Sequence, residues 1–376
     1  MTRSKVARIG AVAGAFGVAV AGQVLAGAGI AQAVPAAGTG WRVVATAGSK
    51  QNPGLMEAVV AVAPRDAWAF GALTSAATPG TYSSIVRHWN GRSWRKAVLP
   101  PAVSSALSGL PSTVAGGSAA TNIWAFTAAG AWVRFNGRSW SHGLLPRDQG
   151  DVGVITTPVV ISPHDVWALG YYNPVSPLPY IAHYNGRHWS ITHLFIDTAI
   201  VAASALGPKD IWAVGQDNKN VLLHFNGRSW RNEKLPARAS AAYFAGVTAL
   251  SDKKVWITGD VQGLGNVVPG VMLWNGRSLG FHALTAPAPL FNTVPDGHGG
   301  IWAVAQQPGA VPAFRPEIWH YTSGRWQSLH IPHSDGADFV DQFAAVPGSR
   351  STWAVGRFKS GSLDLPAILA DGPLPR

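Results

Sequence analysis

The sequence predicts an all-β protein built from one repeated four-stranded unit, and three observations support this fold class. Aromatic usage is dominated by Trp, with 17 copies among 376 residues. Gly (43) and Pro (27) are frequent enough to supply many tight turns. Two short motifs alternate along the chain, and their period is typical of the four-stranded blades of a β-propeller.

The first motif reads Asp-apolar-Trp-Ala-apolar-Gly and predicts the second strand, B, of each blade. Complete copies begin at Asp66, Asp165 and Asp210. A Pro-x-Asp turn precedes each complete copy, because Pro presets φ and the Asp side chain bonds nearby amides, so strand A ends there. With the degenerate copies, the motif recurs at intervals of 43 to 56 residues and contains Trp68, Trp124, Trp167, Trp212, Trp256, Trp302 and Trp353.

The second motif reads aromatic-Asn-Gly-Arg-Ser-Trp and predicts a hairpin between strands C and D. Asn-Gly between apolar stretches indicates a two-residue type I′ turn, because both residues tolerate positive φ. Good copies span residues 89–94, 135–140, 184–189 and 225–230, and worn copies span 274–279 and 321–326. Four antiparallel strands per repeat follow from the two hairpins.

The ends of the chain predict how the ring closes. After Trp353 the last repeat reaches Asp371-Gly372 and lacks a strand D, whereas residues 38–45 form a lone strand D. Joining the two pieces completes a seventh blade and protects the terminal strand edges from pairing with other chains. We therefore predict an all-β, seven-bladed β-propeller that the N-terminal strand closes.

The first 33 residues predict a signal peptide, which leaves residues 34–376 as the propeller domain. A basic start is followed by an apolar run over residues 9–30 and by Ala31-Gln32-Ala33, a small-x-small cleavage pattern. The alternative is an uncleaved transmembrane anchor. After cleavage we expect a monomer that does not span a membrane and is secreted, extracellular or associated with the cell envelope. The absence of Cys excludes disulfides and a lipoprotein anchor.

These repeats resemble the Trp-rich repeats of secreted bacterial propeller proteins, near the sialidase, kelch and galactose-oxidase propellers. Gly91-Arg92-Ser93-Trp94 is similar to the end of the sialidase Asp-box, but Arg87 and Trp89 stand where that motif has Ser and Asp. The paired Gly of kelch repeats is also missing. The resemblance therefore implies the architecture and transfers no activity.

Strand alternation places the repeated Pro-x-Asp and Asn-Gly-Arg turns on one face and the variable B–C and D–A loops on the other. Individual loops on a rigid scaffold suit ligand contact, so we predict the binding site on the variable face. Its candidate residues are aromatic or cationic: Tyr82, Tyr171, Tyr172, Tyr180, Phe314 and Arg315. The alternative is that these rings pack within their own Pro-rich loops.

Other residue sets suit structural roles. We expect the regularly spaced Trp residues at the interfaces between blades. We expect no cofactor, and no metal site either, because the candidate ligands belong to different blades: His88, His183, His224 and His320. Galactose-oxidase chemistry needs a Cys–Tyr crosslink and is excluded. A carboxylate pair drawn from Asp260, Asp338 or Asp341 would still permit glycoside hydrolysis.

The net charge is +11, and it falls to +8 without Arg3, Lys5 and Arg8. Arginines of the six C–D turns contribute much of it, and such a ring would attract polyanions of the envelope or serve only as solvated turn residues. No nucleic-acid recognition module accompanies the charge.

We predict a non-catalytic binding propeller whose partner is a glycan, an anionic envelope polymer or a protein; the alternative is a carbohydrate-active hydrolase of the sialidase-like type.

Overall fold

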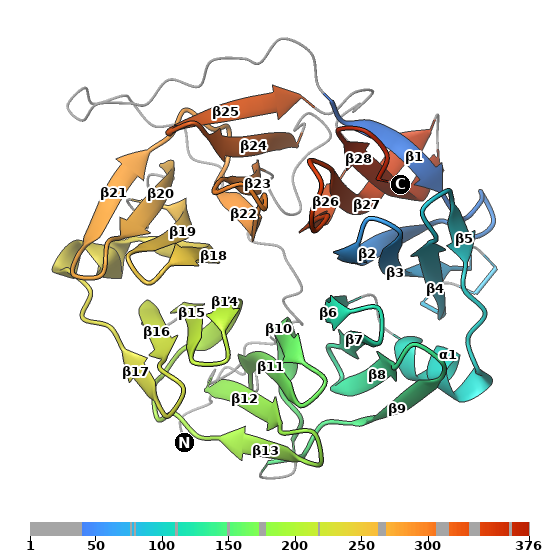
Figure 1. Ribbon diagram of the computed structural model, residues 1–376, viewed down its shortest axis with the longest axis horizontal. Coiled ribbons are helices and arrows are strands. Elements are labelled where there is room, and N and C mark those ends of the chain that lie inside the picture. The colour runs from blue at the N-terminus through green and yellow to red at the C-terminus, as the bar shows by residue number, and fades with distance from the viewer. Residues whose placement is uncertain are drawn as a thin grey trace, which may run out of the picture.

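Seven four-stranded antiparallel sheets surround a central axis as the blades of a β-propeller in this computed structural model (Figure 1). The structure describes residues 40–375 except 76, 79, 110–111, 149–150, 173–177, 217–218, 262–267, 306–315, 331–338 and 361–362. In each blade the first strand lies nearest the axis and the last lies at the rim (Figure 1). The predicted fold class is confirmed.

The first four blades follow one another along the chain. Blade 1 contains β2 (Gly54–Ala63), β3 (Asp66–Thr74), β4 (Tyr82–Trp89) and β5 (Trp94–Lys96). Blade 2 contains β6 (Thr113–Ala119), β7 (Asn122–Thr127), β8 (Ala131–Phe135) and β9 (Trp140–Leu144). Blade 3 contains β10 (Val154–Ser162), β11 (Asp165–Tyr171), β12 (Pro179–Tyr184) and β13 (Trp189–Thr192). Blade 4 contains β14 (Ala199–Gly207), β15 (Asp210–Gln216), β16 (Val221–Phe225) and β17 (Trp230–Asn232).

The remaining blades complete the ring. Blade 5 contains β18 (Tyr243–Ser251), β19 (Lys254–Asp260), β20 (Pro269–Trp274) and β21 (Leu279–Ala283). Blade 6 contains β22 (Leu290–Pro295), β23 (Ile301–Ala305), β24 (Glu317–Thr322) and β25 (Arg325–His330). Blade 7 contains β26 (Phe339–Ala345), β27 (Thr352–Ser360), β28 (Leu363–Asp371) and β1 (Arg42–Thr46).

The N-terminal strand closes the ring, as predicted. β1 is antiparallel to β28, and the register pairs Arg42 with Ala370 and Thr46 with Ala367. Arg87 of blade 1 also donates a hydrogen bond to the Thr46 carbonyl at 3.2 Å, which ties the closing strand to the next blade. Chain segments from the two ends thus share one sheet, and the edge of β28 is paired.

A Trp of each strand B packs against the following blade, and this confirms the predicted role of the repeated Trp residues. Its partners are the aromatic side chains on both sides of the next C–D turn. Centroid distances run from 4.8 Å for Trp256–Tyr321 to 6.5 Å for Trp212–Trp274. The remaining contacts are Trp68–Phe135, Trp68–Trp140, Trp124–Tyr184, Trp124–Trp189, Trp167–Phe225, Trp167–Trp230, Trp256–Trp326, Trp302–Trp41, Trp353–Trp89 and Trp353–Trp94. Large rings with edge-to-face or tilted contacts stabilise these interfaces beyond the area they bury.

The innermost strands are also joined by polar side chains that bond to the backbone of a neighbouring blade. Glu57 accepts from the Thr113 amide, and Gln342 accepts from the Val59 amide at 2.8 Å. Similar bonds join Thr156 to the Ile200 carbonyl, Ser204 to the Ala249 amide and Asn292 to the Val340 carbonyl. Glu57, Thr156 and Asn292 lie at irregularities of strand A, which turn these side chains away from the regular alternation.

Two short helices occupy D–A connections. α1 (Pro101–Leu107) buries Val103 and Leu107 against blades 1 and 2, and the 3-10 helix η1 (Ala237–Ala241) buries Ala239 against blade 5. Among the described residues, no helix has the length and apolar character that a membrane crossing needs.

Candidate functional site

The propeller has two different faces, as the sequence predicted. We name the face with the A–B and C–D turns the turn face, and the face with the B–C and D–A connections the loop face. Strands B and C run further into the predicted B–C loops than expected, because Tyr82 pairs with Thr74 and Tyr171 pairs with Pro179. Tyr82, Tyr171 and Tyr180 therefore lie at strand ends and not in free loops.

The loop face of blade 3 contains an anchored pair of tyrosines. The hydroxyl of Tyr172 donates to Asp148 Oδ2 at 3.0 Å, and His193 Nδ1 lies 3.4 Å from the same oxygen. Tyr180 is fully buried, and its hydroxyl donates to the Pro146 carbonyl at 2.9 Å. The two rings meet edge to face at 5.0 Å. The connection that leads into blade 3 is thus fixed to the tyrosines by hydrogen bonds.

Both tyrosines are held in the neutral form. Burial raises the pKa of Tyr172 above its ordinary value, and the hydrogen bond to the Asp148 carboxylate raises it further. Burial also raises the pKa of Tyr180, with a contribution from Asp148. These hydroxyls therefore act as hydrogen-bond donors and are unsuited to act as nucleophiles.

The structure brings only part of the predicted site together. Tyr171, Tyr172 and Tyr180 gather in blade 3, whereas Tyr82 is half-buried at the start of β4 in blade 1. Because Tyr180 has no exposed surface, it cannot contact a partner directly and instead packs against Tyr172. Phe314 and Arg315 lie outside the described residues.

Sequence reasoning missed three exposed apolar side chains at the loop-face connections around blade 3. Phe195 is 94% exposed in the connection after β13, Leu144 is 64% exposed at the end of β9, and Leu178 is 40% exposed before β12. Two of them are close to the tyrosine pair along the backbone, because the Leu178 carbonyl accepts a hydrogen bond from the Tyr172 amide and Phe195 follows His193 by two residues. Phe195 stands between Leu194 and Ile196, and Leu144 precedes Leu145, so the sequence does not distinguish these exposed residues from core residues.

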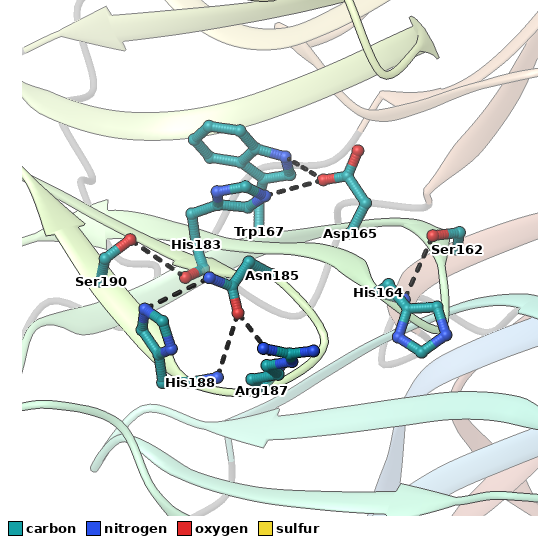
Figure 2. Close-up of polar contacts among 9 residues, drawn as sticks. All are labelled: Ser162, His164, Asp165, Trp167, His183, Asn185, Arg187, His188 and Ser190. Carbon is teal, nitrogen blue, oxygen red and sulfur yellow. Dashed lines mark hydrogen bonds and ion pairs between the residues drawn. The ribbon is translucent and has the colours of Figure 1, made fainter.

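The turn face carries a repeated cluster of Asp, Trp and His, which Figure 2 shows for blade 3. The His183 ring stacks on Trp167 at 3.9 Å, and its Nε2 lies 2.9 Å from Asp165 Oδ1. Trp167 Nε1 donates to the same oxygen at 2.8 Å. Because a carboxylate only accepts, His183 carries its proton on Nε2. Each cluster belongs to one blade, so the four histidines do not converge.

The cluster recurs with variations. His88 and Asp66 in blade 1 and His224 and Asp210 in blade 4 repeat the bond at 3.0 and 2.9 Å. In blade 6, His320 bonds to Asp296, which also accepts from the His298 and Gly300 amides. Burial alone would raise the pKa of Asp296, but these hydrogen bonds hold it below its ordinary value. In blade 2, Asn122 replaces Asp and Arg134 lies over Trp124 at 5.2 Å.

A ring of exposed arginines surrounds the turn face. In the C–D turns of the first five blades the Asn side chain accepts from the amides of the Arg and of the residue after it, two and three positions later. The turn is thereby fixed and the Arg side chain is exposed; Figure 2 shows Asn185 and Arg187. Blade 6 adds Arg325. None of these guanidinium groups forms an ion pair with a described residue. The six residues are Arg92, Arg138, Arg187, Arg228, Arg277 and Arg325.

Two carboxyl groups of neighbouring blades interact where blade 7 meets blade 1. Burial raises the pKa of Glu57 to about 7, and its hydrogen bond with Thr113 opposes the rise. Burial raises the pKa of Asp341 well above its usual range; the Glu57 charge adds to this effect and Arg357 opposes it. Of the predicted acids, Asp338 lies outside the described residues. No group of three or more metal-ligating side chains occurs within the described ranges.

Comparison with known proteins yields structural likeness alone. No protein-family model and no curated protein matches the sequence. YCF48 from Cyanidioschyzon merolae is 13% identical, with a TM-score of 0.57 over 89% of this chain and 99% of that one. YCF48 bound to a D1 peptide is 11% identical, with a TM-score of 0.55 over 90% and 97%. The GH74 xyloglucanase of Xanthomonas campestris is 14% identical, with a TM-score of 0.53 over 86% of this chain and 55% of the enzyme. Because binding proteins and enzymes share this architecture, the likeness shows the fold and no specific function.

Proposed function

We propose that this protein is a non-catalytic binding protein, secreted or held at the cell envelope, that contacts its partner through the loop face of blade 3. The observation that carries the proposal is the exposure of Leu144, Leu178 and Phe195 at the loop-face connections that lead into, lie within and lead out of blade 3. With Tyr171 and Tyr172 they make up the proposed surface. A partner that covers Phe195, which is 94% exposed, removes apolar surface from water at about 25 cal/mol per Å². Apolar groups of this kind favour a polypeptide partner, and the aromatic rings leave a glycan as the other partner class.

The hydrogen bonds below this surface support the proposal. Asp148 holds Tyr172 and His193 together, and Pro146 accepts from the buried Tyr180. A surface that is fixed before binding loses less conformational entropy when the partner arrives. Tyr82, Phe314 and Arg315 stay proposed as partner contacts.

Export is part of this proposal and rests on residues 1–33, which lie outside the described residues. We expect the exported protein to lack them. Mass spectrometry of the mature N-terminus tests this, and an intact peptide that begins at Met1 would contradict it.

Site-specific photo-crosslinking tests the binding surface. A photoreactive phenylalanine analogue is placed at Phe195 and, as the control, at Val98, which is 92% exposed in the D–A connection of blade 1. In producing cells we expect one discrete crosslinked species from position 195 that is absent from position 98, and protease or glycosidase digestion then assigns it to a protein or a glycan. No adduct at 195, or the same adducts at both positions, would refute the assignment of this surface.

A glycoside hydrolase is the second candidate, because two carboxyl groups with raised pKa meet across blades 7 and 1. An acid with a pKa of about 7, as Glu57 has, suits proton donation. Glu57, however, is only 9% exposed and accepts from the Thr113 amide, as expected of a residue that joins blades. Release of reducing ends from envelope polysaccharides that the wild-type protein shows and Asp341→Asn lacks would favour the hydrolase.

A further inference from the structure

An open hollow of about 320 Å³ lies on the turn face where blade 1 meets blade 2. Its wall combines aromatic side chains with a few polar groups. The lining residues are Asp66, Trp68, His88, Ala120, Thr121, Phe135 and Gly137. Ligand sites have this composition, with an apolar surface and a few convergent polar groups.

One side chain of the lining is shorter than its counterparts in several blades. In blades 1, 3, 4 and 5 a longer residue before the Asp position of the A–B turn lies over the glycine of the C–D turn, as Lys209 does over Gly227. Arg65, His164 and Lys253 have the same position in blades 1, 3 and 5. In blade 2 the residue at this position is Thr121. It follows Ala120, whereas a Pro precedes the equivalent residue in blades 1, 3 and 4. His88 beside the hollow is 35% exposed against 29, 21 and 18% for His183, His224 and His320, and Asp66 is 19% exposed, within the range of 7 to 28% of the equivalent Asp residues.

We propose that this hollow binds a single sugar ring that carries an anionic group, as a unit of an acidic polysaccharide. Its volume of about 320 Å³ lies at the lower end of the range of about 300–1,000 Å³ that small-molecule sites span, as expected for one sugar unit. The half-buried ring of Phe135 offers an apolar surface to the C–H face of a pyranose. This site is on the opposite face from the blade 3 surface and does not depend on it.

The polar groups determine the class of ligand. Asp66 Oδ1 accepts from Trp68 and His88, whereas no described residue donates to its Oδ2, which can accept from a sugar hydroxyl. Arg138 follows the lining residue Gly137 and is exposed. A guanidinium group pairs with carboxylate, sulfate or phosphate. The surrounding ring of turn arginines raises the local concentration of polyanions.

The test uses a substitution that should strengthen the binding of an acidic sugar if charge alone matters and weaken it if the shape of the hollow matters. Thr121→Lys adds a positive charge and should fill the hollow with a long side chain over Gly137, in the position that Lys209 has over Gly227 in blade 4. Thr121→Ser is the matched control, and thermal melting verifies that each variant is folded. Isothermal titration uses trigalacturonate, its methyl ester, a sulfated and a phosphorylated oligosaccharide of equal length, and neutral maltotriose.

We expect one site for at least one acidic probe, no binding of maltotriose or of the methyl ester, and affinity at least tenfold weaker in Thr121→Lys. The double variant Pro208→Ala/Lys209→Thr removes a charge and opens the equivalent hollow beside Asp165, Trp167 and His183, so it should bind two molecules. Unchanged or tighter binding by Thr121→Lys would show that charge alone attracts the polymer and would overturn the proposal. Failure of all acidic probes would overturn it as well.

Discussion

The carboxylate of Glu57 in blade 1 accepts a hydrogen bond from the backbone amide of Thr113 in blade 2, with 3.1 Å between Oε2 and N. This bond belongs to the series that joins innermost strands around the axis. It gives Glu57 a structural role and places a titratable group in a position where burial disfavours its charged form. The stability of the ring should therefore depend on pH.

Glu57→Gln should raise the melting temperature at pH 8 and have little effect at pH 5. Burial raises the pKa of Glu57 from 4.5 to about 7, so its contribution to stability is fully present below pH 4.5 and is lost as the pH rises to about 7. The amide keeps an acceptor for Thr113 without the charge, and the gain at pH 8 should be on the order of 1–3 kcal/mol. Thermal melts at both pH values measure it. Glu233→Gln, away from the inner ring, is the control, and an equal gain there would contradict the argument.

Trp41→Ala should strongly destabilise the protein, because it removes the rim contact of the closing blade. Trp41 is 1% exposed and meets Trp302 at 5.4 Å and Phe343 at 5.7 Å. Truncating a buried Trp costs about 3–5 kcal/mol. Chemical denaturation measures the loss, and Val43→Ala, at a position 42% exposed on the same strand, should cost far less. Similar losses for the two variants would show that the closing strand contributes through its backbone alone.

Asp296→Asn should destabilise the protein at neutral pH and lose this effect in acid. Burial opposes the charge of Asp296, but the bonds from His320, His298 and Gly300 hold its pKa below the ordinary value of 3.8. A carboxyl group whose pKa is lowered by folding stabilises the folded state at pH values above 3.8. This stabilisation is lost as the pH falls through the pKa of the folded state. The melting temperatures of the two proteins should differ at pH 7 and approach each other below pH 3.8. A constant difference over this range would mean that shape, and not charge, matters at this position.

The fold was predictable because its signals are local and repeated. Asn-Gly turns and strand B tryptophans specify each blade within a few dozen residues, and the lone strand at residues 38–45 identifies the closure. The site was harder to predict. Burial of Tyr180 depends on Pro146, which lies 34 residues earlier in a different connection. The hollow is lined by Thr121, and that this residue is shorter than Lys209 can be recognised only when the blades are compared at equivalent positions.

A double-mutant cycle on Asp165 and His183 should reveal coupling within the turn-face cluster. Asp165 accepts from both Trp167 and His183, so His183→Ala removes one donor and the stacked ring, and Asp165→Ala leaves the buried Trp167 and the half-buried His183 without their acceptor. The single variants should each lose about 1–3 kcal/mol, and the double variant should lose less than their sum. In blade 5 both members of the Asp–His pair are replaced. Lys254 stands at the position of Asp165 and Leu273 at the position of His183, on either side of Trp256. Denaturant titration of the four proteins measures the coupling energy, and strictly additive losses would show that the cluster acts as independent contacts.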